Sequence, residues 1–288
     1  MQDEHYDAAQ ERLRLGHKRR GRAERVEARR TAVREMLGPQ SHLVDTVGSM
    51  LSDAYWIAES EDIIARNLQQ YEESQAADDR LSIRCDVDEE RGATVVSVIA
   101  QDHPGLFYRI AGGIHLAGAH IIDARIHTAS NGTAFDNLLV QDRHRQPFSE
   151  DTQIGRLKKG VRDALMANVE LVQKLAARPL RHSRSKAFKI APSVAFDNNA
   201  SNRFTVIEVS ARDRPALLNR LAYALFRANL IVHSAHVTAY GESAADTFYV
   251  TDLTGSKILS EERLDDIRRA LLAAASDKRQ RQLEKATT

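Results

Sequence analysis

A short segment occurs twice in this chain, and the duplication constrains the fold more than any other feature of the sequence. The first copy is Ala100–Leu106 (AQDHPGL) and the second is Ala211–Leu217 (ARDRPAL). In each copy an apolar run leads into Asp, a variable residue, Pro, a small residue and Leu. This order is typical of a strand, a tight turn and the start of a helix, with the Asp as N-cap and the Pro in the first helical turn.

The match between the two copies extends well beyond the turn. Asp213 lies 111 residues after Asp102, and the apolar residues before and after the two turns keep this offset. After a predicted hairpin the offset becomes 110, so that Asp246 corresponds to Asp136. A long register that changes only at a turn indicates two copies of one supersecondary unit.

The first copy shows a strand, a helix, two strands and a second helix. Residues Thr94–Ala100 alternate like a strand, and apolar residues at helical spacing follow Leu106 up to a closing glycine, Gly118. Asn131-Gly132 is a strong hairpin signal. The remaining predicted elements are the strands His120–Thr128 and Thr133–Gln141, a helix capped by Ser149 with the stripe Ile154, Leu157, Val161, Leu165, Val169 and Val172, and a fourth strand at Ser193–Phe196.

The second copy ends differently. Its closing helix is predicted from Ser260, with Leu264, Ile267, Leu271 and Leu272 on one face, and no strand follows it. One edge of its sheet is therefore open unless a strand from the linker or from another chain covers it.

These patterns predict an α+β fold with tandem ferredoxin-like βαββαβ domains, preceded by an α-helical segment. The helical segment contains the only Trp, within Ala54–Ala58 (AYWIA), and such an aromatic group is typical of a small core or a docking face. Residues 72–92 are polar and acidic and are interpreted as a linker. The expected parts are 1–90 (helical segment and linker), 93–177 (first domain), 178–202 (linker with a possible added strand), 203–276 (second domain) and 277–288 (polar tail).

Composition excludes several classes of protein. A net charge of +1 over 288 residues argues against a dedicated nucleic-acid binder. No apolar run approaches the roughly 20 residues of a membrane span, and the charged N-terminus does not resemble a signal peptide. Cys85 is the single cysteine, which excludes an intrachain disulfide and a cysteine-built zinc site. We expect a cytoplasmic protein.

Catalytic motifs are absent from the sequence. There is no Gly-rich phosphate loop, no Gly-x-Ser-x-Gly elbow and no His-Glu-x-x-His, and none of the 11 histidines is followed directly by Asp. Asp86 and Asp88 form an isolated Asp-x-Asp and are interpreted as linker charges. We therefore predict no catalytic residue, no metal ligand and no cofactor in this chain.

The histidines do not form an evident metal site. His115, His120 and His127 are scattered over a predicted helix and strand, without a second acid or a cysteine beside them. His233 and His236 are predicted on opposite faces of one strand, where they cannot readily share an ion.

The two turns are the candidate ligand sites. A helix start offers N–H groups to the carboxylate of an amino acid, and the neighbouring Asp could hold its ammonium group. The alternative is that the Asp only caps the helix and the turn is structural. Gly105 is expected to leave the first turn open, whereas the Cβ of Ala216 narrows the second. The candidate ligand-binding residues are Asp102, His103, Gly105, Leu106, Asp213, Arg214, Ala216 and Leu217.

The duplicated unit with its Asp-x-Pro-(Gly/Ala)-Leu turn resembles a pair of ACT domains, small modules that commonly bind amino acids where copies meet. Most of the chain is similar to the C-terminal part of the bifunctional PII uridylyltransferase/uridylyl-removing enzyme family. The motifs that carry this resemblance are Asp102–Leu106 (DHPGL), Asn202–Ser210 (NRFTVIEVS), Asp213–Pro215 (DRP), Ser234–Val237 (SAHV), Asp246–Asp252 (DTFYVTD) and Ala54–Ala58.

The resemblance implies that the chain senses glutamine and thereby sets the balance between uridylylation and deuridylylation of the PII nitrogen-signalling protein. The nucleotidyltransferase and phosphohydrolase domains of that family, which would use Mg²⁺, are expected upstream of Met1, so no catalytic residue is transferred to this chain. The resemblance further implies pairing between ACT domains, within or between chains. Two alternatives stay open: a freestanding ACT-repeat protein that binds amino acids or partners without catalysis, and an independent enzyme, which would need to transfer UMP to PII by itself.

Overall fold

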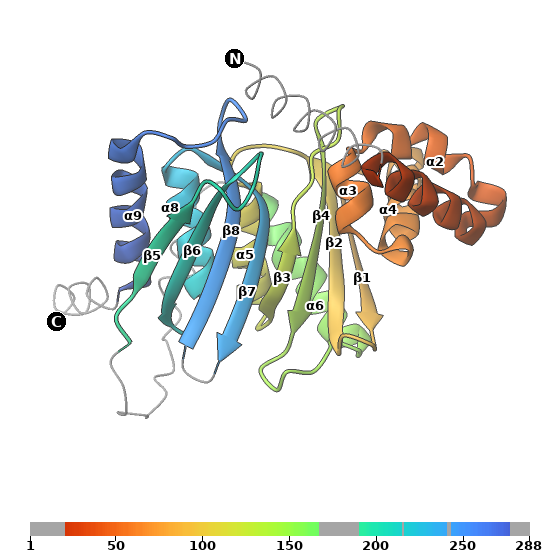
Figure 1. The fold of residues 1–288 in the computed structure, drawn as a ribbon. Coiled ribbons are helices and arrows are strands. Elements are labelled where there is room, and N and C mark those ends of the chain that lie inside the picture. The colour runs from red at the N-terminus through yellow and green to blue at the C-terminus, as the bar shows by residue number, and fades with distance from the viewer. Residues whose placement is uncertain (1–20, 167–189, 215, 241–242, 277–288) are drawn as a thin grey trace, which may run out of the picture. The chain divides into compact units, whose positions relative to one another are not determined.

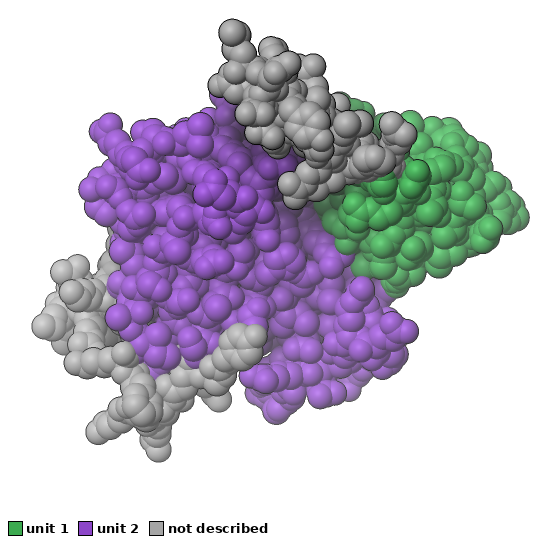
Figure 2. All heavy atoms as spheres, viewed as in Figure 1, with its two compact units in different colours: residues 1–82, 99–101, 127–135 green, residues 83–98, 102–126, 136–288 purple. Residues whose placement is uncertain are grey.

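The structure is a computed structural model and describes residues 21–166, 190–214, 216–240 and 243–276. The chain divides into two compact units, drawn in different colours in Figure 2. Unit 1 comprises residues 1–82, 99–101 and 127–135, and unit 2 comprises residues 83–98, 102–126 and 136–288. Unit 1 therefore takes in a short part of the first repeat, around its Asn131-Gly132 turn.

Unit 1 is mainly helical, as the sequence predicts. Residues 21–37 are helical, and α3 is capped by Ser52, whose side chain accepts a hydrogen bond from the backbone N–H of Tyr55. The further helices are η1 (Gly38–Gln40), α2 (Leu43–Thr46), η2 (Gly48–Met50), α3 (Asp53–Ala58) and α4 (Glu61–Ala76).

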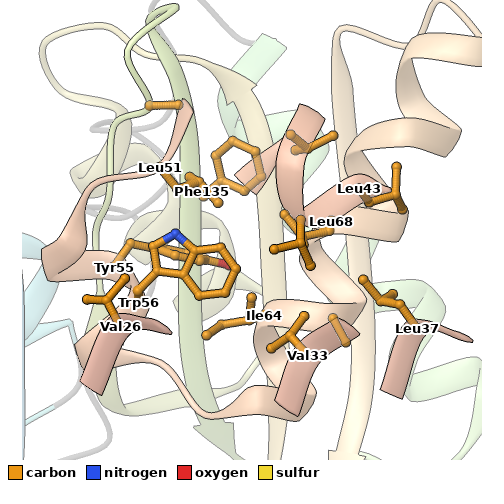
Figure 3. Close-up of a cluster of buried hydrophobic side chains, with 14 of the residues drawn as sticks. Val26, Val33, Leu37, Leu43, Leu51, Tyr55, Trp56, Ile64, Leu68 and Phe135 are labelled. Atoms are coloured by element: carbon orange, nitrogen blue, oxygen red, sulfur yellow. The ribbon is translucent and has the colours of Figure 1, made fainter. Parts of the chain in front are cut away.

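The aromatic residues of unit 1 form a core. Tyr55 and Trp56 are fully buried, and both polar groups have partners. The Trp56 indole donates to the carbonyl of Gly48 at 3.2 Å, and the Asn67 amide donates to the Tyr55 hydroxyl at 2.9 Å. Figure 3 shows the aliphatic side chains from several helices gathered around these rings, together with Phe135. The interpretation of this segment as a small core is confirmed.

The strands form one eight-stranded sheet in the order β1-β2-β4-β3-β7-β8-β6-β5. The first repeat contributes one half of this order and the second repeat the other. The halves meet where β3 pairs antiparallel with β7, with Ala124 opposite Ala235. The strands are β1 (Leu81–Asp88), β2 (Ala93–Gln101), β3 (His120–Arg125), β4 (Thr133–Gln141), β5 (Ser193–Asp197), β6 (Thr205–Arg212), β7 (Leu230–Tyr240) and β8 (Ser243–Asp252).

The helices of unit 2 lie on one face of the sheet (Figure 1). Each repeat contributes two of them: α5 (Leu106–Leu116) and α6 (Asp151–Met166) from the first, and α8 (Leu217–Arg227) and α9 (Glu261–Ala275) from the second. Packing occurs within each repeat, between α5 and α6 and between α8 and α9, and also across the repeats, between α5 and α8. The predicted class, α+β with tandem ferredoxin-like domains after a helical segment, is confirmed.

The fourth strand of each repeat differs from the prediction. Ser193–Phe196 was expected to complete the first repeat, but β5 pairs with β6, with Val194 opposite Val209. It therefore covers the predicted open edge of the second repeat. The short connection from β5 to β6 favours this antiparallel hairpin.

The first repeat obtains its edge strand from a segment interpreted as linker. Residues Leu81–Asp88 form β1, which lies beside β2. Each repeat is thus ββαββα in chain order, and its edge strand, β1 or β5, comes first in the sequence. The polar composition that suggested a linker is explained by the position of β1 at a sheet edge, where only one side is paired.

The closing helices follow the predicted pattern. The Ser260 side chain accepts from the backbone N–H of Arg263, and Leu264, Ile267 and Leu271 are buried. In α6 the buried residues are Leu157, Val161 and Ala164, while the predicted stripe positions Val169 and Val172 lie outside the described residues.

The contact between α5 and α6 depends on Gly113. A Cβ added there would lie 2.6 Å from the carbonyl oxygen of Gly160 and 2.7 Å from the Cα of Val161, both backbone atoms. We expect Gly113→Ala to lower the free energy of unfolding by about 2 kcal/mol, because the helices must separate and the better helix propensity of Ala offsets only part of this cost. Urea denaturation measures the change.

Gly155 provides the matched control for this prediction. It lies in α6, is exposed, and a Cβ added there meets nothing within 4 Å. Gly155→Ala is therefore expected to stabilise by up to about 1 kcal/mol. Equal, small effects of the two substitutions would contradict the close helix contact at Gly113.

Candidate ligand site

The turn before α5 is closed by the backbone. The N–H of Leu106 donates to the carbonyl of His103 at 3.1 Å, and Gly105 has φ 89° and ψ 2°. These angles are those of the third residue of a type II turn, which requires a positive φ and therefore favours Gly.

The expected N-caps are wrong. The residue that precedes α5 is Gly105 and the one that precedes α8 is Ala216, both in the left-handed conformation and without a side-chain cap. Asp102 and Asp213 lie three residues earlier. A small residue with positive φ leads the chain directly into the helix, so the turn does not need a carboxylate cap.

The turn before α8 has the same backbone closure but carries an Ala at the strained position. The N–H of Leu217 donates to the carbonyl of Arg214 at 3.1 Å, and Ala216 has φ 61°. An L-residue other than Gly is disfavoured in this region by about 1–2 kcal/mol. The second turn therefore stores strain that the first does not.

Arg214, a predicted ligand residue, has a structural role in the second turn. Its Nη2 donates to the carbonyls of Ala274 and Ser276 at 2.9 and 3.3 Å. These carbonyls lie at the C-terminal end of α9, where a cation is favoured by the helix dipole. Arg214 thus ties the turn to α9.

The other predicted ligand residues divide into exposed and buried ones. His103 is exposed, with Nδ1 3.1 Å from the carbonyl of Pro104. Asp102 is partly buried and Asp213 is exposed. Leu106 and Leu217 are buried and belong to the helix-sheet core, so their side chains are not available to a ligand.

Aromatic rings fill the space beside the first turn. Tyr108 lies with its ring centroid 5.1 Å from that of Phe226 and 5.3 Å from that of Tyr223, both on α8. A Cβ added at Gly105 would lie 2.7 Å from the Tyr108 ring and 3.0 Å from the Phe226 ring. The expectation that Gly105 leaves this turn open is therefore not met, because the two rings occupy that space.

A buried carboxyl group, that of Asp246, is close enough to Asp213 of the second turn to interact with it electrostatically. Asp246 lies in β8 opposite Val209 and Val237 and is 2% exposed. Its Oδ1 has no hydrogen-bond partner among the described residues. Burial, and then the charge of Asp213, raise the pKa of Asp246 to about 7. The sequence signal for this burial is that Asp246 shares its strand face with the apolar residues Ala244, Phe248 and Val250.

His233 and His236 lie on the same face of β7, and the prediction of opposite faces is wrong. The register of β7 shifts between Val232 and Ser234, and such a bulge breaks the alternation of side chains. The ring of His233 lies 4.7 Å from that of Phe204, and the rings of Phe204 and His236 both contact Tyr249, at 6.4 and 5.9 Å.

No metal site forms around the candidate ligands. The described residues contain no group of three or more His, Cys, Asp or Glu side chains able to hold an ion. The His236 Nδ1 lies 2.7 Å from the Asp123 carboxylate, whose hydrogen bond raises the pKa of His236. The Nε2 of His127 lies 3.3 Å from the buried Glu59 carboxylate.

The structure gives no indication that Asp86, Asp88 or Cys85 takes part in metal binding or catalysis. Asp86 and Asp88 lie on β1 rather than in a linker, and they pair with Arg84 and Arg91 at 3.2 and 2.7 Å. Burial raises the pKa of the Cys85 thiol to about 12, so it is not a reactive thiolate at neutral pH.

Comparison with known proteins adds a relationship that the geometry alone does not give. No family model matches the chain. A protein of Erythrobacter litoralis is 62% identical over 98% of the chain, and one of Zymomonas mobilis is 45% identical over 88%. Both are bifunctional uridylyltransferase/uridylyl-removing enzymes. The chain is homologous to a region of these enzymes.

The match to the uridylyltransferase/uridylyl-removing enzymes confirms the resemblance expected from the sequence. The chain spans only 31% of the length of the Erythrobacter enzyme and 28% of the Zymomonas enzyme. Two solved structures also align, a protein of Galdieria sulphuraria and one described as a glycine cleavage system transcriptional repressor. Their sequence identities are 11% and 16%, and TM-scores of 0.22 and 0.21 carry no argument about function. No helix among the described residues is long and apolar enough to cross a membrane.

Proposed function

We propose that this chain is the glutamine-sensing regulatory region of a PII-protein uridylyltransferase/uridylyl-removing enzyme, a role that places it in the cytoplasm. The observation that carries the proposal is the similarity to these enzymes along nearly the whole chain, combined with two repeats whose Asp-x-Pro turns lead into helices that pack on each other. The catalytic steps and the Mg²⁺ they use belong to other parts of the enzyme, and PII is engaged through the complete protein.

The arrangement of the repeats supports binding of a small effector. β3 pairs with β7, and the amide of Asn219 on α8 donates to the carbonyl of Tyr108 on α5 at 2.8 Å. The helices that begin at the two turns are therefore coupled directly, as expected for paired ACT domains. A ligand bound at either turn contacts the start of one of these helices and can change how it packs on the other.

Calorimetric titration of the chain with glutamine tests the proposal. We expect saturable heat at millimolar glutamine or below, together with a rise in thermal unfolding temperature that grows with ligand concentration. A panel of the other amino acids should give smaller shifts. A folded chain that shows neither heat nor a thermal shift with glutamine would contradict the sensing role.

A further inference from the structure

The eight-stranded sheet ends in two edge strands, β1 and β5. In the described sheet each of them has a neighbouring strand on one side only (Figure 1). The outer side of an edge strand presents backbone N–H and C=O groups that can pair with a further strand. β1 offers the longer edge, with eight residues against five in β5.

The two faces of β1 differ in chemistry. Because side chains alternate along a strand, the apolar residues Ile83, Cys85 and Val87 share one face. Lys158 of α6 acts electrostatically on the Cys85 thiol, so this apolar face is turned toward the helices. The intervening residues therefore lie on the helix-free face of the sheet.

The helix-free face of β1 carries an Arg and an Asp two positions apart. Nε of Arg84 lies 3.2 Å from the carboxylate of Asp86, and the two side chains remain 35% and 23% exposed. Both groups thus keep surface for a further contact at the edge of the sheet. The two charges stand on either side of Cys85, one positive and one negative, and this arrangement is complementary to itself when the strand is reversed.

A second copy of β1 fits this edge when the pairing is centred on Cys85. Two strands related by a two-fold axis perpendicular to the sheet run antiparallel, and residues of the same face lie opposite each other. Arg84 then lies opposite Asp86 of the second copy, and Asp86 opposite Arg84. On the other face Ile83 lies opposite Val87. Opposite charges and apolar residues directly across two strands both stabilise the pairing.

The neighbouring registers and the other edge are less favourable. Centring the pairing on Arg84 places two Arg side chains opposite each other, and centring it on Asp86 places two Asp side chains there, which destabilises a strand pair. A pairing of β5 centred on Ala195 places Ser193 opposite Asp197 and forms no ion pair. Charge complementarity therefore selects β1, in one register.

We propose that two copies of this chain associate through their β1 strands, antiparallel and centred on Cys85, so that their two sheets become one continuous sheet. The partner is recognised by two reciprocal contacts between Arg84 and Asp86, together with the backbone ladder. This contact is distinct from the pairing of β3 with β7, which joins the repeats within one chain. It goes beyond the proposed function, because it requires no effector.

Sedimentation equilibrium of the whole chain over micromolar concentrations tests the association. We expect a reversible dimer, whose dissociation constant rises at least tenfold in Arg84→Asp and in Asp86→Arg, because each change places like charges opposite each other. Arg269→Asp is the control with the same change of charge. Arg269 pairs with Asp266 on α9, is 74% exposed and lies in the other repeat, so this variant should change the constant by less than twofold.

Combining the variants tests the register. In a mixture of Arg84→Asp chains with Asp86→Arg chains, both contacts of a mixed dimer join opposite charges. Mixed dimers should therefore form with an affinity within threefold of the original, and native mass spectrometry distinguishes them from dimers of either variant. The double variant Arg84→Asp/Asp86→Arg should likewise dimerise by itself. Circular dichroism shows that each variant is folded, and if one single variant fails to fold, the other is compared with the double variant.

Three outcomes would overturn the proposal. The first is a chain that remains monomeric over the whole concentration range. The second is a dimer that neither single variant weakens, because its contact would then lie elsewhere. The third is a loss of dimer in the single variants that neither the mixture nor the double variant restores, which would exclude the pairing centred on Cys85. Glutamine titration of the same samples is independent of all three.

Discussion

Replacing Glu59 by Ala is expected to lower the free energy of unfolding of unit 1 by about 3–5 kcal/mol. The Glu59 side chain is fully buried and its carboxylate lies 3.3 Å from Nε2 of His127, which is itself 12% exposed. The ring of His127 is held edge-on against Tyr55 at 5.0 Å. Removing one member of a buried pair leaves the other without its partner and creates a cavity, and both effects destabilise. Chemical denaturation followed by Trp56 fluorescence measures the loss.

Glu61 is the matched control for Glu59. It pairs with Arg29 at 3.1 Å, but its side chain is 41% exposed, and exposed pairs contribute less than about 1 kcal/mol. Glu61→Ala should therefore have a small effect. A double-mutant cycle with His127→Ala separates the pair interaction from the loss of packing, and a coupling energy near zero would show that the two side chains do not stabilise each other.

Asp246 is expected to make the stability of unit 2 fall as the pH rises from about 4 to about 7. The pKa of Asp246 in the folded protein is about 7, whereas the ordinary pKa of an Asp side chain is 3.8. Between these values the folded protein holds a proton that the unfolded chain releases. The stabilisation is therefore complete below pH 4 and is lost as the pH passes through 7. The difference of about three units sets an upper bound of about 4 kcal/mol.

Asp246→Asn tests this pH dependence. The amide is neutral at every pH, so we expect the variant to gain stability relative to the original chain as the pH rises from 4 to 8, and urea denaturation at several pH values measures the gain. His236 has a raised pKa and acts in the same direction above pH 6.5, but it is present in both proteins and cancels. Asp266→Asn, an exposed position in α9, should change stability by less than about 0.5 kcal/mol at any pH. A constant difference between Asp246→Asn and the original chain would refute the assigned pKa.

Much of the fold could be predicted because the chain contains two copies of one unit, and aligning them shows which positions have the same structural role. Three features depend only on residues close together in sequence and were predicted for that reason: the helix after each turn, the Asn131-Gly132 turn and the Ser260 cap. The edge strands could not be assigned in the same way. Whether Ser193–Asp197 pairs with the first or the second repeat depends on contacts between strands far apart in sequence, and a short polar strand such as β1 has no distinctive pattern.

The candidate site was also only partly predictable from the sequence. The two turns were found from sequence, because Asp-x-Pro and a small residue specify a tight turn. The rings beside Gly105 were not, because Phe226 reaches that turn only through the packing of α8 on α5. The position of His233 depends on a bulge in β7, which the alternation of residues does not reveal.

The placement of each edge strand in front of its repeat has a consequence for synthesis on the ribosome. β1 leaves the ribosome before β2, and β5 before β6, so all four strands of each half of the sheet come from one repeat, and its edge strand emerges first. The first repeat can bury its core once α6 has emerged, without waiting for a strand from the second. Domains that emerge first generally fold first. This order shortens the time during which β2 presents an unpaired edge to other nascent chains.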